Sequence, residues 1–443
     1  MPVDRATGQA WLIWTTAVLV YVAAVFHRTT LGVAGLQAGE RFGLGPAALS
    51  TFTVLQVGVY ALMQIPTGLL VDRFGPRRVL TAAALFMGAG QTLFALADSY
   101  ALGVTARVVL GVGDAMTFVS VLRLAAAHFP PRRFPVIMTL TAALGAAGNL
   151  VSTVPLTLLL HSAGWTWTFL IAGVATAVFS AAVVLGVRDV PSGAPVPVVE
   201  PVPLRTLARR VRTAWRVPGT RLGFWAHFST MSTPAVLGML WGYPYLVQGQ
   251  GLSATAASSV LSLLVVSAIV GGPLFGAVIS RLPAARMPIT IGYLALAVVL
   301  WTVLLGWPGG RVPLPVIAVV FFLLALGGPI SGVAFALARD YNPMHRVSTA
   351  TGVVNVGGFL AVTFTALAVG VLLDLADGLP RAQAYRIGLL PVAVVLLLGT
   401  WRTTAWWRRA RAEVFAAEAR GEEVPVRIRQ RRWDAAELEP ASA

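Results

Sequence analysis

Three ionised side chains stand deep inside long apolar stretches of this sequence. They are Arg28, Arg107 and Asp114. Placing one such charge in the hydrocarbon of a bilayer costs at least about 2.5–3.5 kcal/mol, so a chain that keeps three of them is expected to use them. An arginine can hold an anion, and a carboxylic acid can carry a proton. These residues are therefore the first candidates for binding and coupling chemistry.

Arg107 and Asp114 are seven residues apart with Gly111 between them, a spacing that puts all three on one face of a helix. We expect Arg107 and Asp114 to form an ion pair, which a proton or an anionic solute opens by competing for one partner. Burial and a neighbouring arginine act in opposite directions on the proton affinity of a carboxyl group, so a change of conformation could switch its protonation. The alternative is a static structural ion pair.

Arg28 lies in the stretch YVAAVFHRTTLGVAG. Its guanidinium offers paired donors that suit a phosphate or a carboxylate, so we expect it to contact an anionic substrate. The alternative is a side chain that snorkels to the outer interface. Four polar or aromatic residues further along are secondary candidates, with helix packing as their alternative role: His227, Trp241, Tyr243 and Asn355.

These charges are embedded in a very apolar chain. Of its 443 residues, 57% are hydrophobic and only 11% are charged, and the mean hydropathy is +0.78. Soluble domains carry about 25% charged residues, so most of this chain must face lipid. The absence of cysteine excludes disulfides, thiolate metal sites and thiol nucleophiles. The stretch MPVDRATGQA lacks the basic region and cleavage site of a removable signal peptide, so we expect the first apolar run to stay as a spanning helix.

The elements that must position the charges are membrane-spanning helices, each of which needs about 20 mainly apolar residues. Glycine and proline recur inside the apolar runs, which bundled membrane helices tolerate. On this basis we predict twelve spans, at residues 10–34, 47–70, 79–98, 101–127, 136–160, 166–187, 220–246, 255–280, 288–306, 315–338, 348–373 and 384–402.

The placement of the basic residues, all of them arginine, predicts the orientation. With a cytoplasmic N-terminus, the cytoplasmic stretches hold 26 of the 33 arginines, the external loops hold 4 and the span interiors hold 3. The positive-inside rule then places both termini in the cytoplasm. Because the net charge of +16 is dispersed over loops beside an anionic leaflet, it does not indicate nucleic-acid binding.

The chain also repeats itself. GLLVDRFGPRR at 68–78 returns as GAVISRLPAAR at 276–286, a shift of 208, and FPPRR returns as NPMHR with a shift of 213. Two echoes at nearly equal shifts predict duplicated halves. We therefore divide the chain into an N-terminal six-helix bundle, a cytoplasmic linker with an amphipathic helix in LRTLARRVRTAWR, a C-terminal six-helix bundle and a basic cytoplasmic tail, at 1–187, 188–219, 220–402 and 403–443.

The first echo resembles motif A of the major facilitator superfamily and lies, like it, between the second and third spans. The residues of the motif are Gly68, Asp72, Arg73, Gly75, Arg77 and Arg78. Arg107-x3-Gly111-x-Gly113 resembles motif B of that superfamily, and GWTWTF at 164–169 is another recurrent feature of it. The resemblance implies an all-α membrane protein of twelve transmembrane helices, with two pseudosymmetric six-helix bundles around a central cavity.

The resemblance also implies a cytoplasmic gate. Asp72 would meet the start of the eleventh span near 347–351, where a helix N-terminus favours a carboxylate, and would tie the two halves together while the site faces outward. Gly68 and Gly75 would permit close approach and turning of the backbone. Arg123 is expected to be a partner of Asp72 or a snorkelled anchor.

Three features refine the function that the resemblance implies. Asp114 stands where motif B usually has a small residue, and the fifth span lacks the Gly-Pro dipeptide of proton-coupled drug antiporters. The surroundings of Arg28 resemble the first span of organophosphate:phosphate antiporters, in which an arginine grips the anionic group of the substrate. We therefore predict a secondary transporter that moves a small organic or inorganic anion by alternating access, as a proton-coupled symporter or antiporter.

The alternatives are a proton-coupled efflux transporter for drugs or metabolites and a transporter-like receptor or scaffold. An enzyme is not expected, because the sequence has no Ser/His/Asp, HExxH or P-loop constellation. The expected partners are a small-molecule substrate, protons and the lipid bilayer, without nucleic acid, cofactor or metal. We expect a monomer that crosses the cytoplasmic (inner) membrane of a bacterium many times.

Overall fold

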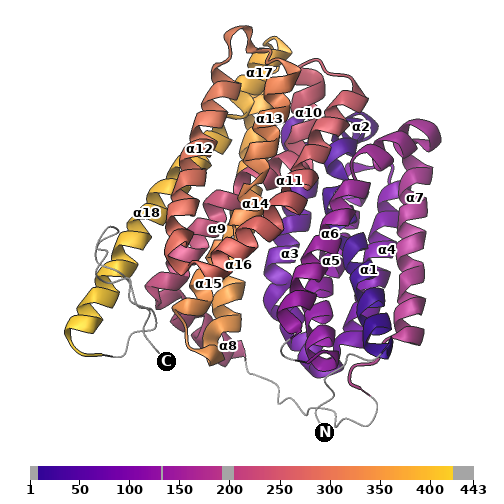
Figure 1. The fold of residues 1–443 in the computed structure, drawn as a ribbon. Helices are drawn as coiled ribbons and strands as arrows, with labels where there is room; N and C mark the ends of the chain where they lie inside the picture. Colours follow the sequence, from indigo (N-terminus) through magenta and orange to yellow (C-terminus); the bar gives the residue numbers. More distant parts are fainter. Residues whose placement is uncertain (1–7, 131–132, 192–203, 423–443) are drawn as a thin grey trace.

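The structure is a computed structural model that describes the chain except residues 1–7, 131–132, 192–203 and 423–443. Within the described ranges the regular elements are all helices. Figure 1 shows two groups of helices standing side by side, one running from α1 to α7 and the other from α9 to α18. The chain is therefore an all-α protein built from two helical bundles.

The first group is formed by α1 (Gly8–Thr29), α2 (Leu31–Phe42), α3 (Pro46–Phe74), α4 (Pro76–Leu96), α5 (Tyr100–His128), α6 (Phe134–Val151) and α7 (Val154–Gly186). The helix α2 follows α1 after one residue, so helical structure extends beyond the predicted end of the first span at residue 34. Within α7, Gly164 has a φ of 71°, which favours glycine and bends the helix. This bend falls between the predicted fifth and sixth spans.

The second group contains α9 (Pro218–Val236), η1 (Leu237–Trp241), α10 (Gly242–Pro244), η2 (Tyr245–Gly249), α11 (Ala254–Arg281), η3 (Pro283–Ala285), α12 (Arg286–Gly306), η4 (Pro308–Gly310), α13 (Leu314–Ala325), α14 (Gly327–Ile330), α15 (Gly332–Asp340), α16 (Met344–Leu375), α17 (Arg381–Gly388) and α18 (Leu390–Ala419). The turns η1 and η2 have π-helical geometry and follow Pro234 and Pro244, each of which removes a backbone donor.

Ten stretches of the described chain are long and apolar enough to cross a membrane. One of them, Val136–Gly186, has 51 residues and contains the bend at Gly164, so it covers two predicted spans. The run from α9 to η2 covers the predicted seventh span and is not among the ten. Each of the twelve predicted spans thus coincides with a helical stretch.

The linker and the C-terminal part contain further helix. In the predicted linker, α8 (Leu204–Arg216) occupies the segment LRTLARRVRTAWR and packs on α9 and α16. At the other end, α18 continues without a break to Ala419, past the predicted end of the last span at residue 402. The first part of the predicted tail is therefore a direct extension of the last helix, while residues 423–443 lie outside the described part. The domain boundaries themselves remain predictions.

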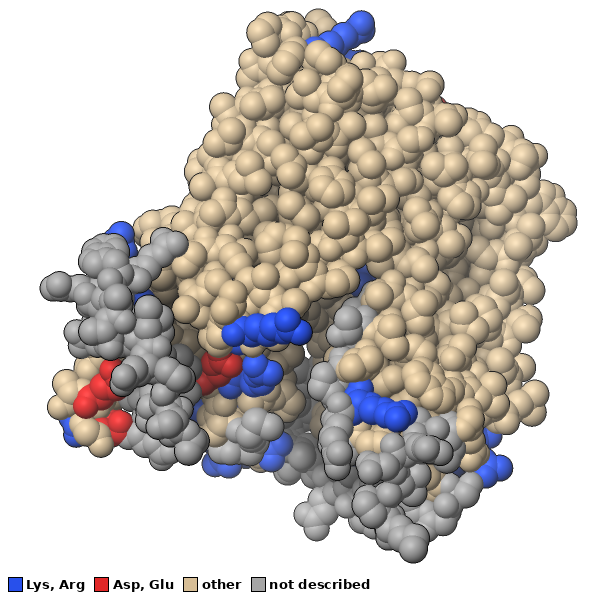
Figure 2. Space-filling model, viewed as in Figure 1, with Lys and Arg blue, Asp and Glu red and all other residues tan. Residues whose placement is uncertain are grey.

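The outer surface of the bundle is suited to lipid. Large apolar side chains such as Trp167 and Leu185 are 63% and 87% exposed. In Figure 2 the upper and middle parts of the visible face are almost free of charge, and most of the charged atoms gather at the lower end. That is the end where α1 begins and α18 ends in Figure 1. An apolar band bounded by charge is the surface of a protein that spans a membrane.

The two groups are sealed together at the opposite end. Between α3 and α16, the Ala47 N–H donates to Asp374 Oδ2 at 3.0 Å, and Ser50 Oγ donates to the carbonyl oxygen of Ala366 at 3.0 Å. The hydroxyl oxygens of Thr157 (α7) and Ser258 (α11) lie 2.8 Å apart in the same seam. Toward the other end the groups diverge in Figure 1, and a Cβ placed on Gly68 or Gly352 would meet nothing within 4 Å. These hydrogen bonds between the two groups thus lie at the end opposite the charged one.

Candidate functional site

The centre of the candidate site is an ion pair between Arg28 and Asp114. Arg28 lies in the last turn of α1, and Asp114 lies in the middle of α5. Arg28 Nε donates to Asp114 Oδ2 at 2.9 Å and its Nη2 donates to Oδ1 at 2.5 Å, which makes the pair bidentate. The Asp114 side chain is fully buried and that of Arg28 is 11% exposed. A carboxylate held in this way occupies the guanidinium edge that a substrate anion would need.

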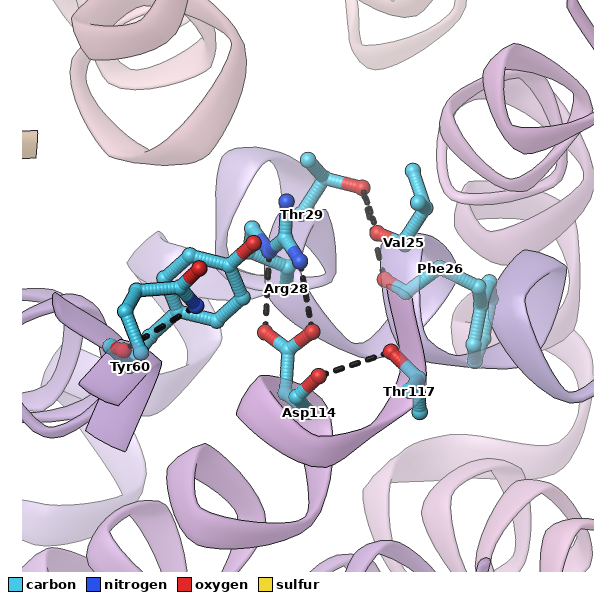
Figure 3. A network of polar contacts seen from close by, with 8 residues as sticks. Val25, Phe26, Arg28, Thr29, Tyr60, Asp114 and Thr117 are labelled. Carbon is cyan, nitrogen blue, oxygen red and sulfur yellow. Dashed lines mark hydrogen bonds and ion pairs between the residues drawn. The ribbon is translucent and has the colours of Figure 1, made fainter. Parts of the chain in front are cut away.

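Aromatic rings surround the Arg28 guanidinium. Its Cζ lies 4.4 Å from the centroid of the Tyr60 ring, and Figure 3 shows Tyr60, from α3, beside the Arg28–Asp114 pair. Phe359, from α16 in the second group, lies 5.9 Å from the same Cζ, and its ring is 4.6 Å from the Tyr60 ring. The guanidinium therefore points into the bundle, which excludes the alternative of a side chain that snorkels to the interface. It is also in contact with both halves.

The expected ion pair between Arg107 and Asp114 is wrong. Arg107 Nη1 donates instead to Gln56 Oε1 at 3.1 Å and to the His27 carbonyl oxygen at 3.5 Å. The reason is geometric, because seven residues of helix separate two side chains by about 10 Å along the axis even when they share a face. At the level of Asp114, the neighbouring α1 presents Arg28, and at the level of Arg107 it presents backbone and hydroxyl acceptors.

Arg107 is a buried cation without a carboxylate partner among the described residues. Its side chain is fully buried, and its Cζ lies 4.0 Å from the centroid of the Phe94 ring. Removing a charge from water is costly unless it is paired, and hydrogen bonds and a ring face compensate only in part. Two guanidinium groups and one carboxylate leave one net positive charge in this region.

Four residues around the pair were missed at the level of sequence: His27, Gln56, Tyr60 and Phe359. His27 precedes Arg28, is fully buried, and holds Thr176 Oγ1 at 2.8 Å through Nε2. A polar side chain in an otherwise apolar run was the available signal for His27 and Gln56. The two aromatic residues gave no signal, because a single Tyr or Phe in a membrane helix is most often packing.

The secondary candidates separate into different roles. Trp241 is buried, and its Nε1 donates to the Ala366 carbonyl oxygen at 2.9 Å, which holds η1 against α16. Tyr243, in α10, is buried in the main hydrophobic core of the protein. His227 is buried in α9 with its ring 4.9 Å from that of Phe335. Asn355 is half-buried in α16, one turn before Phe359 and on the same face. The structure brings only Asn355 onto the helix face that reaches Arg28.

The predicted gate residues gather at the end opposite the seam. Gly75 ends α3 with a φ of 82°, and α4 begins at the next residue. Asp72 lies 3.7 Å from Arg123, and the two side chains are 44% and 48% exposed, respectively. Among the described residues this is the only ion pair of Asp72, so the expected contact with the start of α16 is not made in this conformation. Whether Asp72 closes the gate in another conformation stays a prediction.

Asp189 is a further residue of the gate region that sequence reasoning missed. Its Oδ1 accepts the backbone N–H of Arg77 at 2.6 Å, and its carboxylate lies against Gly75, where a Cβ would collide with it. The Arg77 side chain also donates to the Val184 carbonyl oxygen at the end of α7. These contacts tie the turn between α3 and α4 to the end of α7. Arg73 and Arg78 are exposed beside them.

A cavity of about 870 Å³ opens at this turn. It is lined by the whole stretch from Asp72 to Arg78, together with Arg123 and Asp189. No group of three or more His, Asp or Glu side chains that could hold a metal ion occurs in the part of the chain that the structure describes.

Comparisons with known proteins agree with this architecture. The family model described as Major Facilitator Superfamily matches residues 17–358. The probable galactarate/D-glucarate transporter GudP of Escherichia coli (strain K12) is 23% identical over 432 residues, covering 88% of this chain and 93% of that protein. The probable sulfoacetate transporter SauU of Cupriavidus necator is 28% identical over 155 residues, and the match spans only 36% of SauU and 35% of this chain.

A solved structure has the same fold. A bacterial homologue of the human lysosomal transporter Spinster, solved in an inward-facing and unoccupied conformation, superposes with a TM-score of 0.71. The identity is 16%, and the match covers 91% of this chain and 98% of that one. At this identity the likeness concerns the arrangement of the helices and carries no information on the solute.

Proposed function

The chain belongs to the Major Facilitator Superfamily, and from that membership we propose that it carries a small organic anion across the membrane by alternating access, coupled to protons. As a member of this family it is a multi-pass membrane transporter and not an enzyme. The proposal concerns the class of solute and the coupling ion. The observation that carries it is the buried Arg28–Asp114 pair beside the unpaired cation of Arg107.

The charge balance of the site favours an anion that enters with a proton. In the empty site, two arginines and one carboxylate give a net charge of +1. If a proton neutralises Asp114 and a monoanion replaces it on Arg28, the two arginines and the anion again give +1. The loaded and the empty site then carry the same buried charge. The free-energy cost of burying that charge is therefore the same for both forms when the protein changes between its outward-facing and inward-facing conformations. An anion without a proton would break this balance.

The solute class that we propose is a small hydroxylated carboxylate or a short sulfonate. A guanidinium edge binds either group through paired donors, and the remaining polar side chains near Arg28 include Thr29 and Gln56. The names of two similar proteins, for galactarate/D-glucarate and sulfoacetate, support this class.

We further infer the orientation and the gate. Both termini are assigned to the cytoplasm, so the sealed end faces outward and motif A faces the cytoplasm. Asp72 is then the latch that closes the cytoplasmic side when the outer seam opens. A single chain holds both halves of the site, so we propose a monomer as the working unit.

The test uses purified protein in liposomes. Uptake of labelled D-gluconate, a monoanion of the kind that the charge balance favours, and of the dianions D-glucarate, galactarate and sulfoacetate is measured with and without an inward proton gradient, in the wild type and in Asp114→Asn. In Asp114→Asn the rate of gradient-driven uptake is expected to be at least tenfold lower than in the wild type, while exchange between labelled and unlabelled solute is retained. Asp98→Asn, an exposed acid at the sealed end, is the control and is expected to behave like the wild type.

The possible outcomes separate the alternatives. Gradient-driven uptake that persists in Asp114→Asn removes Asp114 from coupling but leaves anion transport standing. Transport of lipophilic drugs without any anion transport would replace the proposed solute by the drug-efflux alternative. If no solute of either panel crosses, the receptor or scaffold alternative takes its place.

A further inference from the structure

At the lower end of the second group, arginine side chains stack on tryptophan rings. The Arg221 Cζ lies 4.7 Å from the centroid of the Trp406 ring and 5.4 Å from that of Trp215. The Arg409 Cζ lies 4.9 Å from the same Trp406 ring. One buried indole, contributed by α18, therefore has two guanidinium groups against it, one from α9 and one from α18.

These two cations have no acidic partner in the part of the chain that the structure describes. Arg221 Nε donates to the Trp215 carbonyl oxygen at 2.7 Å, which fixes its position. Among the described residues, neither Arg221 nor Arg409 forms an ion pair with a carboxylate. Glu413 follows Arg409 by one turn but is exposed. Two like charges that lie within 5 Å of the centroid of one ring repel each other, and an anion bound beside both would reduce this repulsion.

Most of the neighbouring charges are also positive. Arg402 lies seven residues before Arg409, on the same face of α18. Its Cζ is 5.0 Å from the centroid of the Trp225 ring and 5.5 Å from that of Trp401. Arg411 stacks on Trp407 and Phe415 at 5.9 and 5.3 Å. In α8, which packs on α9, five arginines occur without one acid, and all five are exposed: Arg205, Arg209, Arg210, Arg212 and Arg216.

The depth of this cluster is that of the lipid head groups. The last predicted span ends at residue 402, and Trp401 beside it is 62% exposed on the outside of the bundle. Tryptophan collects where hydrocarbon meets head groups, and arginine extends from there toward phosphate. The Trp406 cluster is defined as Trp406, Arg221 and Arg409. Its α18 members, Trp406 and Arg409, lie about one and two turns beyond residue 402.

We propose that the Trp406 cluster binds the phosphate of an anionic phospholipid, of the phosphatidylglycerol type. A phosphodiester between the two guanidinium groups accepts charge-assisted hydrogen bonds from both and removes their repulsion. The free hydroxyls of a glycerol head group add no cation, whereas the ammonium of a zwitterionic head group would add one to a region that is already positive. The lipid would hold the extension of α18 and the start of α9 together at the membrane surface.

The experiment measures lipid retention by native mass spectrometry of the purified full-length protein. Micelles are doped with phosphatidylglycerol or phosphatidylcholine, and the variants are Arg409→Gln and Arg221→Gln. The matched control is Arg408→Gln, which removes an exposed charge from the adjacent position, where no ring contact occurs among the described residues. Arg409→Gln and Arg221→Gln are expected to retain phosphatidylglycerol about tenfold less than the wild type, and Arg408→Gln is expected to match it.

Three results would overturn the proposal. The first is equal retention of phosphatidylglycerol and phosphatidylcholine by the wild type. The second is an equal loss in Arg408→Gln, because the effect would then be bulk charge. The third is displacement of the lipid by millimolar glycerol phosphate, which would make the cluster a site for small soluble phosphates. Arg409 lies on the exposed face of α18, so Arg409→Gln keeps the test valid if Arg221→Gln fails to fold. None of these readouts depends on the transported solute.

Discussion

At the scale of single residues, the decisive feature is the two-bond contact between Arg28 and Asp114. It uses the Nε and one Nη of the guanidinium, so the planar fork of arginine matches both carboxylate oxygens. A lysine at this position has one flexible ammonium and cannot reproduce the fork. The same argument applies to a substrate carboxylate that takes the place of Asp114.

Arg28→Lys is therefore expected to raise the KM for the anion at least about tenfold, because one charge-assisted hydrogen bond of the pair is lost. The melting temperature of the protein should change much less. The measurement is solute exchange in liposomes together with thermal unfolding in detergent. Arg41→Lys serves as the control, because Arg41 donates to the Ala97 carbonyl oxygen and lies beside the Trp165 ring. An unchanged KM in Arg28→Lys would remove Arg28 from the binding site.

Gln56 supplies the shortest hydrogen bond of the buried Arg107. Gln56→Leu leaves a guanidinium donor without its acceptor in a fully buried place, so we expect the free energy of unfolding to fall by about 1–3 kcal/mol. The check is chemical or thermal unfolding in detergent. Gln64→Leu, two turns further along α3, removes only a long bond to the Tyr60 carbonyl oxygen at 3.4 Å and should cost less. Equal losses in the two variants would contradict this account of Arg107.

At the scale of elements, the seam between α3 and α16 holds the sealed end. The residue before α3 is Gly45, which has no side chain to cap the helix. Asp374, at the end of α16, provides the missing cap by accepting the Ala47 N–H, and a Cβ on Gly45 would collide with its carboxylate. A helix N-terminus favours a carboxylate, so this contact joins the two halves by both charge and hydrogen bonding.

Asp374→Ala is expected to weaken the seam by about 1 kcal/mol, which corresponds to roughly a fivefold shift toward conformations open at that end. Because the chain has no cysteine, a single Thr29→Cys beside Arg28 can report access. The measurement is the rate of labelling by a membrane-impermeant maleimide from the proposed outer side.

Asp377→Ala is the matched control for the seam, since the one ion pair of Asp377 among the described residues is with Arg381, at 3.5 Å, in an exposed position. Labelling in this variant should stay at the rate of the unmodified background. If Asp374→Ala labels no faster than Asp377→Ala, the cap does not hold the seam.

At the scale of the whole molecule, the two halves move against each other in the proposed cycle. Among the described residues Asp72 forms an ion pair with Arg123 alone, and such half-exposed ion pairs contribute at most about 1 kcal/mol. Asp72→Asn should therefore change stability little. If Asp72 latches the opposite conformation, its loss should shift the population toward the conformation described here.

The check is a distance distribution between spin labels at Ala126 and Ala284, one in each half at the end where motif A lies. In Asp72→Asn the longer distances are expected to gain population relative to the wild type. The exposed Asp98 offers a control, because Asp98→Asn removes an acid at the sealed end and should leave the distribution unchanged. A distribution that Asp72→Asn leaves unaltered would count against the latch.

Much of this architecture can be predicted from the sequence. Hydrophobic runs of sufficient length mark the spans, because every backbone group in a bilayer must be bonded within a helix. Motif A marks the turn at which α3 ends and α4 begins, and the glycine at its centre has the positive φ that the turn requires. The rarity of charge in the spans singles out Arg28 and Asp114 without any knowledge of the fold.

The sequence by itself thus determined that this chain crosses a membrane and which ionised residues it buries, since both follow from hydrophobicity and from the cost of a buried charge. Only the tertiary structure decided that Asp114 pairs with Arg28 and that Arg107 has no acidic partner among the described residues. Pairing depends on the relative height and rotation of α1, α3 and α5, which are set by side-chain packing between helices distant in the sequence. Periodicity within one helix records which face a residue occupies and not which neighbour stands opposite.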